Sequence, residues 1–201
     1  NSAVERVVRE GTRLMRDLGG TVSTSDVGRT IAELVESRNV EGVGTQMRLP
    51  RIGLMLGDAT GIGPEIAVKV LSAGSTAAVA RLAVIGDARV LQLGMRDAGM
   101  TLAYQAYPRL EDVPWPSESV PLVDLGNVDP ARLTRGEISE ESGRLCGDTL
   151  KYMINLAVAG QLDGICFAPL NKAALHKGGW RFPDEHQMFA HLTGHRGFFG
   201  E

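Results

Sequence analysis

Short apolar runs alternate with amphipathic segments from residue 51 onward, and this alternation constrains the fold more than any other feature of the chain. It predicts strands over residues 51–56, 81–85, 122–125 and 163–167, and helices over residues 64–73, 87–98 and 139–159. The prolines of residues 108–121 predict an irregular surface segment. Alternating strands and helices form right-handed crossovers, which give an α/β fold with a mainly parallel sheet and flanking helices. Ligands of such sheets bind beyond the carboxyl ends of the strands.

The composition is that of an ordinary globular protein. Of 201 residues, 43% are hydrophobic and 22% are charged, which excludes intrinsic disorder and fibrous repeats. The net charge is −3 without a basic block, so we expect no nucleic-acid partner. No apolar run approaches the roughly 20 residues that span a bilayer, and no signal-peptide pattern is present. We therefore expect a cytoplasmic protein with no membrane partner, and we expect Cys146 and Cys166 to be buried reduced thiols.

A glycine-rich turn joins the first predicted strand to the first predicted helix. It runs Gly57-Asp58-Ala59-Thr60-Gly61-Ile62-Gly63-Pro64-Glu65. Backbone amides of such a turn can approach a ligand closely, so the candidate cofactor-binding residues are Gly57, Asp58, Gly61 and Gly63. The turn lacks the Gly-Lys-Ser/Thr of a P-loop and the third glycine of the dinucleotide fingerprint. The alternative is a tight connection whose glycines only permit close packing.

The first 50 residues follow a different pattern. Helical spacing over residues 3–16, and again from Ser23 to about Ser37, predicts two amphipathic helices. Residues 37–50 have no periodicity and have the composition of a linker. We therefore predict a helical segment at 1–36, a linker at 37–50 and an α/β part at 51–201. Because the chain begins with Asn1 and ends at Glu201 without a closing helix, we expect a fragment.

Three segments together resemble a known family. The glycine turn resembles the opening motif of the 4-hydroxythreonine-4-phosphate dehydrogenase (PdxA) family, and residues 168–176 (APLNKAALH) resemble a second motif. Residues 136–139 (GEIS), with Gly143, stand where the family has their counterpart. The resemblance covers residues 50–201, about the first half of such an enzyme. It implies a fold like that of isocitrate/isopropylmalate dehydrogenases, incomplete here at the C-terminus.

The resemblance also implies an activity. It implies an NAD-dependent, metal-requiring oxidation, with decarboxylation, of a small phosphorylated hydroxy acid such as 4-phosphohydroxy-L-threonine, in pyridoxine biosynthesis. It implies a homodimer whose divalent metal is held by histidines beyond Glu201, so we expect no metal ligands within this chain. We expect these 201 residues to be inactive alone. Two alternatives stay open: a divergent dehydrogenase of a different four-carbon sugar acid phosphate, and a non-catalytic fragment that acts as a binding module.

The same resemblance supplies candidate site residues. Lys172 is the candidate catalytic residue, and Asn171 is expected to hold a substrate anion. An ungapped alignment puts Glu185 in place of the family's substrate-binding histidine and His186 in place of its threonine. A carboxylate that faces a phosphate is electrostatically adverse unless a cation neutralises it. Either His186 takes over by a one-residue slip, or the substrate differs.

A second resemblance covers residues 1–40. Residues 17–28 (DLGGTVSTSDVG) resemble the C-terminal end of the isocitrate/isopropylmalate dehydrogenases, and Met47 stands where a PdxA-like protein would begin. This resemblance implies a junction between two related dehydrogenases. The alternative is an ordinary two-helix appendage.

Overall fold

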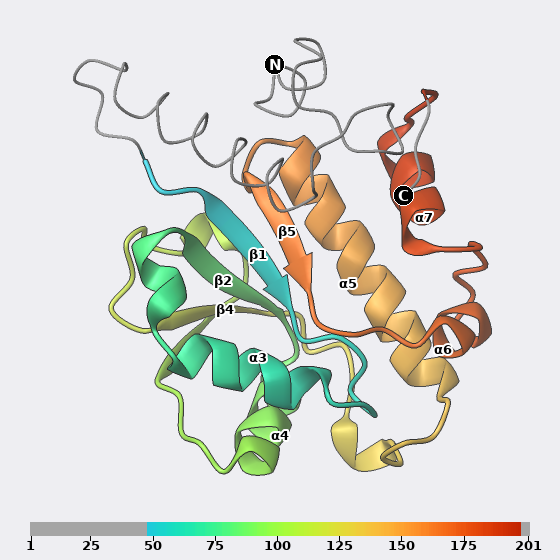
Figure 1. Cartoon of the computed structure of the whole chain (residues 1–201), viewed down its shortest axis with the longest axis horizontal. Helices are drawn as coiled ribbons and strands as arrows, with labels where there is room; N and C mark the ends of the chain where they lie inside the picture. Colours follow the sequence, from blue (N-terminus) through green and yellow to red (C-terminus); the bar gives the residue numbers. More distant parts are fainter. Residues whose placement is uncertain (1–47, 198–201) are drawn as a thin grey trace, which may run out of the picture. The chain divides into compact units, whose positions relative to one another are not determined.

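The computed structural model describes residues 48–197 (Figure 1). The chain divides into two compact units, Asn1–Arg48 and Leu49–Glu201, and the second contains all but one of the described residues. The predicted helices at 1–36 lie outside the described residues, as does the predicted linker up to residue 47. The second resemblance, which covers residues 1–40, and the expected start of the PdxA-like part at Met47 stay predictions for the same reason.

Five strands form one sheet in the order β3-β4-β2-β1-β5 (Figure 1). All neighbouring strands within the described part of the chain are parallel. In the central register, Gly53 of β1 aligns with Ala83 of β2 on one side and with Ile165 of β5 on the other. The strands are β1 (Arg51–Met55), β2 (Arg81–Gly86), β3 (Tyr104–Tyr107), β4 (Val120–Asp124) and β5 (Gly164–Phe167). The predicted parallel α/β sheet is confirmed.

Helices cover both faces of this sheet. The helices are α3 (Gly63–Ser72), α4 (Ala88–Ala98), α5 (Glu140–Val158), α6 (Lys172–Lys177) and α7 (Glu185–Thr193). Short 3-10 turns are η2 (Ser75–Ala78), η3 (Leu110–Asp112) and η4 (Pro130–Arg132). Figure 1 shows α3 and α4 together, apart from α5, α6 and α7. Among the described residues, no helix has the length and apolar character that a membrane span requires.

The two faces bury different residues of the same strands. Leu54, Val84 and Leu122 pack in a cluster with residues of α3 and α4. Their chain neighbours Met55, Ile85 and Val123 pack in a second cluster that includes α5 residues. This two-residue period is the geometry of a strand covered on both faces. It explains why the central strands appear in the sequence as continuous apolar runs.

Helix starts are fixed by side-chain caps at four positions. Asp87, Ser139, Asn171 and Asp184 each accept a hydrogen bond from an amide two or three residues further along, at the starts of α4, α5, α6 and α7. Each cap satisfies an amide that would otherwise lack a helical partner. Because α4 follows β2 and α6 follows β5, these two helices begin close to the carboxyl edge of the sheet.

The structure corrects three sequence predictions. β3 was not predicted, because this short edge strand lacks the continuous apolar run of a buried strand. β4 begins at Val120, so Val120 and Pro121 belong to a strand and not to the irregular segment. Cys166 is exposed, whereas Cys146 is buried as predicted. Cys166 lies on β5, an edge strand whose alternate side chains are less covered.

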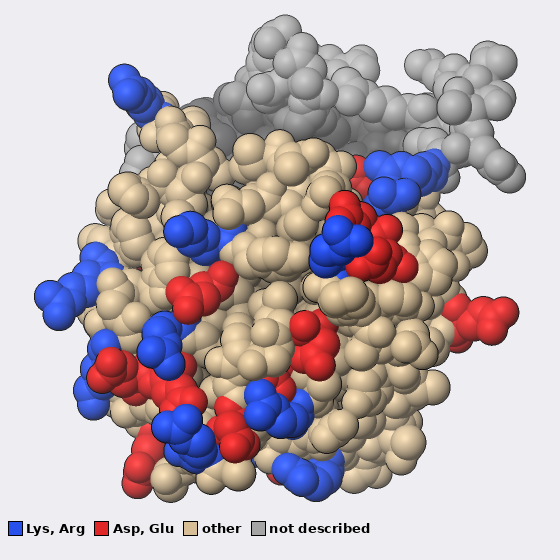
Figure 2. Space-filling view, turned by 180° about the vertical axis from the view of Figure 1, so that it is seen from behind, with Lys and Arg blue, Asp and Glu red and all other residues tan. Residues whose placement is uncertain are grey.

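Positive and negative side chains are mixed on the surface. On the face shown in Figure 2, Lys and Arg side chains lie among Asp and Glu side chains. Among the described residues, the Arg109 guanidinium contacts both Glu111 and Asp112. This face therefore does not present a field of a single sign.

Candidate functional site

The carboxyl ends of β1 and β5 bring two of the family-like motifs into contact. The amide of Asp58 donates to the carbonyl of Pro169 at 3.1 Å. Gly57 has a φ of +77°, and a Cβ atom at this position would lie 2.6 Å from the Pro169 oxygen. Only glycine combines this backbone conformation with this approach at low cost. The turn after β1 and the loop after β5 are therefore one packed unit.

The third family-like segment joins the same unit. The amide of Gly136 donates to the carbonyl of Thr60 at 2.9 Å. The hydroxyl of Ser142, in the first turn of α5, donates to Asp58 Oδ1 at 2.5 Å. The next residue, Gly143, packs so closely on the Ala174 carbonyl of α6 that a Cβ atom would overlap it. Three motifs that are far apart in the sequence thus converge at one edge of the sheet.

Asp58 is the centre of this convergence. Its side chain is only 5% exposed. Its Oδ1 atom accepts hydrogen bonds from the Thr60 amide at 2.8 Å, the Thr60 hydroxyl at 2.8 Å and Ser142. Burial, with a further contribution from the negative Asp58, raises the pKa of the Cys146 thiol on α5. Cys146 is therefore held as a neutral thiol beneath the turn.

The amides of the glycine turn are already engaged within the chain. The amides of Asp58, Thr60 and Gly61 donate to the Pro169 carbonyl, Asp58 Oδ1 and the Asp58 carbonyl, respectively. A Cβ atom at Gly63 would overlap the Leu56 carbonyl, whereas one at Gly61 would make only ordinary contacts. The geometry thus supports close packing as the reason for Gly57 and Gly63. Cofactor binding by Gly57, Asp58, Gly61 and Gly63 stays a prediction.

The loop after β5 leads directly to the candidate substrate residues. Asn171 caps α6, because its Oδ1 accepts from the Ala174 amide at 3.0 Å. Lys172, the first residue of α6, places its Nζ 3.9 Å from Glu185 Oε2 at the start of α7. The Lys172 side chain is 58% exposed and the Glu185 side chain 22% exposed. The structure therefore provides the cation that a carboxylate at position 185 would need beside an anionic substrate.

A small depression lies between α6 and α7. Lys172, His176 and Glu185 line it, with Trp180 and Phe182 beside them. His186 is exposed and is not part of this lining. The structure thus brings Lys172 and Glu185 together, with Asn171 adjacent in the chain, and it leaves His186 on the outer surface. The substrate-binding roles of these residues stay predictions.

Two further carboxylates at this edge were missed by the sequence analysis. Asp87 follows β2 and is 1% exposed. Burial acts to raise its pKa, but hydrogen bonds from the Arg89 side chain and from the Val128 and Arg89 amides outweigh burial and lower the pKa. Asp124, at the end of β4, accepts from the Ala88 and Gly126 amides at 3.0 and 3.1 Å. Their position at or just after the end of a strand was the available signal.

Metal ligands are not gathered in the described part of the chain. Among residues 48–197, no group of three or more His, Cys, Asp and Glu side chains could hold a metal ion. His191 and His195 have the spacing of a helical metal pair, but α7 ends at Thr193 and Gly194 adopts a left-handed conformation. His195 therefore lies beyond the helix. The described residues do not fit a metal ion.

The profile of the family described as pyridoxal phosphate biosynthetic protein PdxA matches residues 78–200. The chain belongs to the PdxA family. Two of the three converging segments lie within this match, and the glycine turn precedes it. The resemblance inferred from the motifs is confirmed.

Curated PdxA-family relatives carry dehydrogenase names. The chain is 41% identical over 146 residues to the D-threonate 4-phosphate dehydrogenase of Cupriavidus necator, covering 73% of the chain and 44% of the relative. It is 35% identical over 144 residues to a putative 4-hydroxythreonine-4-phosphate dehydrogenase of Pasteurella multocida, covering 71% and 43%. The chain thus spans less than half the length of these relatives.

Solved structures agree with the fold. The crystal structure of a 4-hydroxythreonine-4-phosphate dehydrogenase from Burkholderia phymatum matches with a TM-score of 0.68 and 37% identity. The match covers 73% of this chain and 44% of that one. A 4-hydroxythreonine-4-phosphate dehydrogenase from Klebsiella pneumoniae matches with a TM-score of 0.65 and 29% identity, covering 75% and 45%. The predicted fold class is confirmed.

Proposed function

We propose that this PdxA-family chain is part of an NAD-dependent, metal-requiring dehydrogenase that oxidises and decarboxylates a four-carbon hydroxy acid phosphorylated at C4. The observation that carries the proposal is the convergence of the three motif segments on Asp58, whose amide binds the Pro169 carbonyl three residues before Lys172 of the Lys172–Glu185 pair. The dehydrogenase names of two relatives support it. The chain's own contribution is to place a cation and an amide at the carboxyl edge of the sheet.

The chemistry of such an acid explains why oxidation and decarboxylation occur together. When the C3 alcohol is oxidised, the C3 hydrogen leaves with its electron pair and the hydroxyl hydrogen leaves as a proton. Bound NAD supplies the acceptor for that hydride. The new ketone is β to the C1 carboxylate, so the C1–C2 bond can break with release of CO2 and formation of an enolate. Protonation of the enolate at C2 completes the reaction.

Lys172, Asn171 and Glu185 are proposed to hold the substrate. The ammonium group of Lys172 is exposed enough to meet a carboxylate or phosphate. Asn171 uses Oδ1 for the cap of α6, and its Nδ2 group can donate to the same anion. The Lys172 ammonium group would pair with both Glu185 and the substrate. The Glu185 carboxylate would therefore limit the net positive charge beside the substrate. His186, on the adjacent outer surface, is the second candidate contact for the phosphate.

The metal requirement rests on the family resemblance alone. The described residues do not fit a metal ion, and the ligands implied by the resemblance lie beyond Glu201. A homodimer and a cytoplasmic location are proposed on the same basis. Sedimentation velocity tests the dimer independently of activity.

The substrate class allows two candidates that differ at C2. D-Threonate 4-phosphate has a hydroxyl there, whereas 4-phosphohydroxy-L-threonine has an ammonium group. An unpaired Glu185 would favour the ammonium group, but Lys172 already lies 3.9 Å from its carboxylate. The Cupriavidus necator relative, named for D-threonate 4-phosphate, is 41% identical, against 35% for the Pasteurella multocida relative. We therefore place D-threonate 4-phosphate first and 4-phosphohydroxy-L-threonine second.

A substrate panel separates these candidates. The protein, as its source cells make it, is supplied with NAD or NADP, a divalent metal, and each 4-phosphorylated acid or unphosphorylated D-threonate. We expect kcat/KM to be at least roughly tenfold higher with D-threonate 4-phosphate, a difference of about 1.4 kcal/mol in transition-state binding. Strict dependence on 4-phosphohydroxy-L-threonine would reverse the ranking. If none of these acids yields reduced cofactor, the remaining alternative is a non-catalytic binding module.

A further inference from the structure

Two arginines lie side by side at the amino edge of the sheet. Arg51 is the first residue of β1 and Arg81 is the first residue of β2, and the parallel register makes them direct partners. Neighbouring strands are about 4.8 Å apart, and aligned residues project from the same face of a sheet. The two guanidinium groups can therefore reach one common ligand. The candidate site, in contrast, follows the carboxyl ends of β1 and β5.

Trp115 lies on the same face of the sheet as this arginine pair. Arg51 precedes Met55 by four residues on β1, so the two-residue period of a strand puts both on one face. Arg81 precedes Ile85 by four residues on β2 in the same way. Met55 and Ile85 belong to the apolar cluster against which Trp115 packs. The Arg51 guanidinium lies 5.5 Å from the centre of the Trp115 ring, which is a cation–π distance.

Neither guanidinium of the pair has a carboxylate partner. Among residues 48–197, no ion pair involves Arg51 or Arg81. Every other arginine of this range is exposed, whereas these two are partly buried. Like charges directly opposite each other on neighbouring strands destabilise a sheet. The pair thus holds two positive charges that a bound anion would neutralise.

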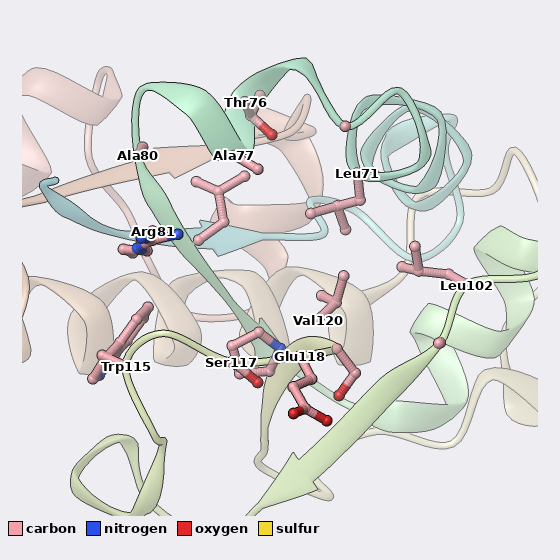
Figure 3. A pocket seen from close by; sticks show the side chains of 15 residues that line it. Leu71, Thr76, Ala77, Ala80, Arg81, Leu102, Trp115, Ser117, Glu118 and Val120 are labelled. Atoms are coloured by element: carbon pink, nitrogen blue, oxygen red, sulfur yellow. The ribbon is translucent and has the colours of Figure 1, made fainter.

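The space beside Arg81 and Trp115 is open to a ligand. Both side chains line a cavity of about 310 Å³ (Figure 3). Ser119 lines the same cavity, and the β2–β4 register, extended toward the amino edge, aligns Ser119 with Arg81. Its hydroxyl can therefore donate to a ligand that Arg81 holds. Small-molecule sites have volumes from about 300 Å³ upward, so the cavity can admit a small molecule.

Two carboxylates lie near this edge of the sheet. Asp163, which precedes β5, accepts a hydrogen bond from the Arg51 backbone amide at 2.7 Å. Because β1 lies between β5 and β2, Asp163 is on the far side of Arg51 from Arg81. Glu118 also lines the cavity, and Figure 3 shows it well apart from Arg81 and Trp115. The two guanidinium charges therefore outnumber the one carboxylate beside them.

We propose that Arg51 and Arg81 bind a phosphate dianion between them, either free or as a phosphate monoester. Phosphate offers about two negative charges and at least three acceptor oxygens, so both guanidinium groups can donate to it. A monocarboxylate has a single charge and would leave one guanidinium unneutralised. Trp115 gives the organic part of a monoester an apolar surface. This site is separate from the anion contacts proposed at Lys172 and does not depend on the dehydrogenase activity.

Calorimetric titration at about pH 8 tests the proposal, in a Lys172→Gln background that removes the cation of the proposed substrate site. The probes are inorganic phosphate and phenyl phosphate, with benzoate as the singly charged control. We expect at least one of the two phosphates to bind with a Kd below about 1 mM, and benzoate to bind about tenfold more weakly or less. Tighter binding of phenyl phosphate would identify a monoester as the ligand, and equal or weaker binding would identify free phosphate. Failure of both phosphates to bind, or equal affinity for benzoate, would overturn the proposal.

Variants then place the anion between the two arginines. Arg51→Gln and Arg81→Gln should each weaken phosphate binding about tenfold or more, whereas Arg96→Gln, at an exposed position of α4, should not. Arg51→Lys and Arg81→Lys keep the charge but lose the paired donors, so their affinities should lie between those of the parent and the glutamine variants. Circular dichroism verifies folding, and the lysine variants decide the test if a glutamine variant does not fold. Binding that none of these four variants weakens would overturn the assignment.

Tryptophan fluorescence locates the anion independently of affinity. The sequence contains two tryptophans, so Trp180→Phe leaves Trp115 as the single one. Because the Arg51 guanidinium lies over the Trp115 ring, phosphate bound by Arg51 should change the fluorescence of Trp115 saturably. The change should follow the calorimetric Kd and should be lost in Arg51→Gln. Phosphate binding without any change in fluorescence would place the anion elsewhere and overturn the proposal.

Discussion

The Ser142 hydroxyl of α5 donates a 2.5 Å hydrogen bond to the carboxylate of Asp58, which lies 84 positions earlier in the turn after β1. Both side chains are buried. The same carboxylate oxygen accepts from the amide and the hydroxyl of Thr60. One side chain therefore connects the glycine turn to the long helix, and the arrangement of the candidate site depends on it.

Asp58→Ala should strongly destabilise the fold. The change leaves the Thr60 and Ser142 donors buried without an acceptor, and we expect a loss of about 3 kcal/mol in the free energy of unfolding. Ser142→Ala removes one donor only and should cost about 1 kcal/mol. Urea denaturation measures both values. Asp148→Ala, at an exposed position of α5, is the control and should behave as wild type. Equal stability of Asp58→Ala and this control would refute the role of Asp58.

Gly57→Ala should cost more stability than Gly99→Ala. Both glycines have positive φ values, +77° and +63°, so both substitutions strain the backbone by about 1–2 kcal/mol. Only Gly57 faces a second obstacle, because its Cβ would lie 2.6 Å from the Pro169 oxygen, whereas Gly99 has nothing within 4 Å. We expect an additional loss of about 1–3 kcal/mol at Gly57. Thermal and urea unfolding of the two variants test the difference, and equal losses would contradict the close approach.

Asp87 should make folding stability depend on pH in the acid range. Its folded pKa is lowered from the ordinary 3.8, so the carboxylate stabilises the fold above that value and loses this contribution as the pH falls through the lowered pKa. The stability difference between wild type and Asp87→Asn should therefore be largest near neutral pH. It should shrink below about pH 4. Urea denaturation at several pH values measures it, and a difference that stays constant with pH would be inconsistent with the lowered pKa.

The two cysteines should react differently with thiol reagents. Cys166 is exposed, whereas Cys146 is buried and its pKa is raised by burial and by Asp58. Because the thiolate is the reactive form, we expect one label per folded chain, located on Cys166. Mass spectrometry of the labelled protein measures this. Cys166→Ser should abolish labelling of the folded chain, and rapid labelling of Cys146 would show that the turn above it opens readily.

Lys172→Gln should impair substrate binding by the proposed dehydrogenase. The change removes the cation beside Glu185, so we expect kcat/KM for the 4-phosphorylated acid to fall at least roughly tenfold. Lys177→Gln provides a matched control, because Lys177 lies on the same short helix α6 and outside the depression. Steady-state kinetics compare the two variants. If Lys172→Gln and Lys177→Gln had equal effects, Lys172 would not be part of the anion site.

His186→Ala tests whether His186, the residue after Glu185, contacts the substrate anion. We expect KM to rise, because a substrate anion would lose a polar partner worth about 1.5–3 kcal/mol. His195→Ala, a histidine beyond the end of α7, is the control. An unchanged KM would remove His186 from the site and leave Glu185 with Lys172.

The central strands of the sheet could be predicted from the sequence because they are buried on both faces. Leu54 and Met55 lie on opposite faces, yet both are apolar, so the strand is a continuous apolar run. β3 has no such run, because it is a short strand at the edge of the sheet. Its prediction would have required knowledge of its pairing with β4. Local pattern thus predicted the strands that form apolar runs, including the edge strand β5, and missed β3, whose sequence (YQAY) contains no such run.

The candidate site was predictable only in its separate parts. The glycine turn and the loop with Lys172 were both recognised as motifs, but their contact through Asp58 and Pro169 depends on the adjacency of β1 and β5. The partner of Asp58 is Ser142, which the sequence does not distinguish from other serines at helix starts. The Lys172–Glu185 pair likewise depends on how α6 packs beside α7. Such long-range partners are determined by tertiary packing, which a single sequence does not display.

Oxidative decarboxylation of D-threonate 4-phosphate is the central claim, and carbon labelling tests it most directly. The protein, as its source cells make it, is incubated with NAD, a divalent metal and substrate that carries ¹³C at C1, and the label is followed by NMR. We predict that the labelled carbon leaves as CO2 or bicarbonate, with one reduced cofactor for each, and that unlabelled dihydroxyacetone phosphate remains. Retention of the label in a four-carbon product, or no reduced cofactor at all, would contradict the account.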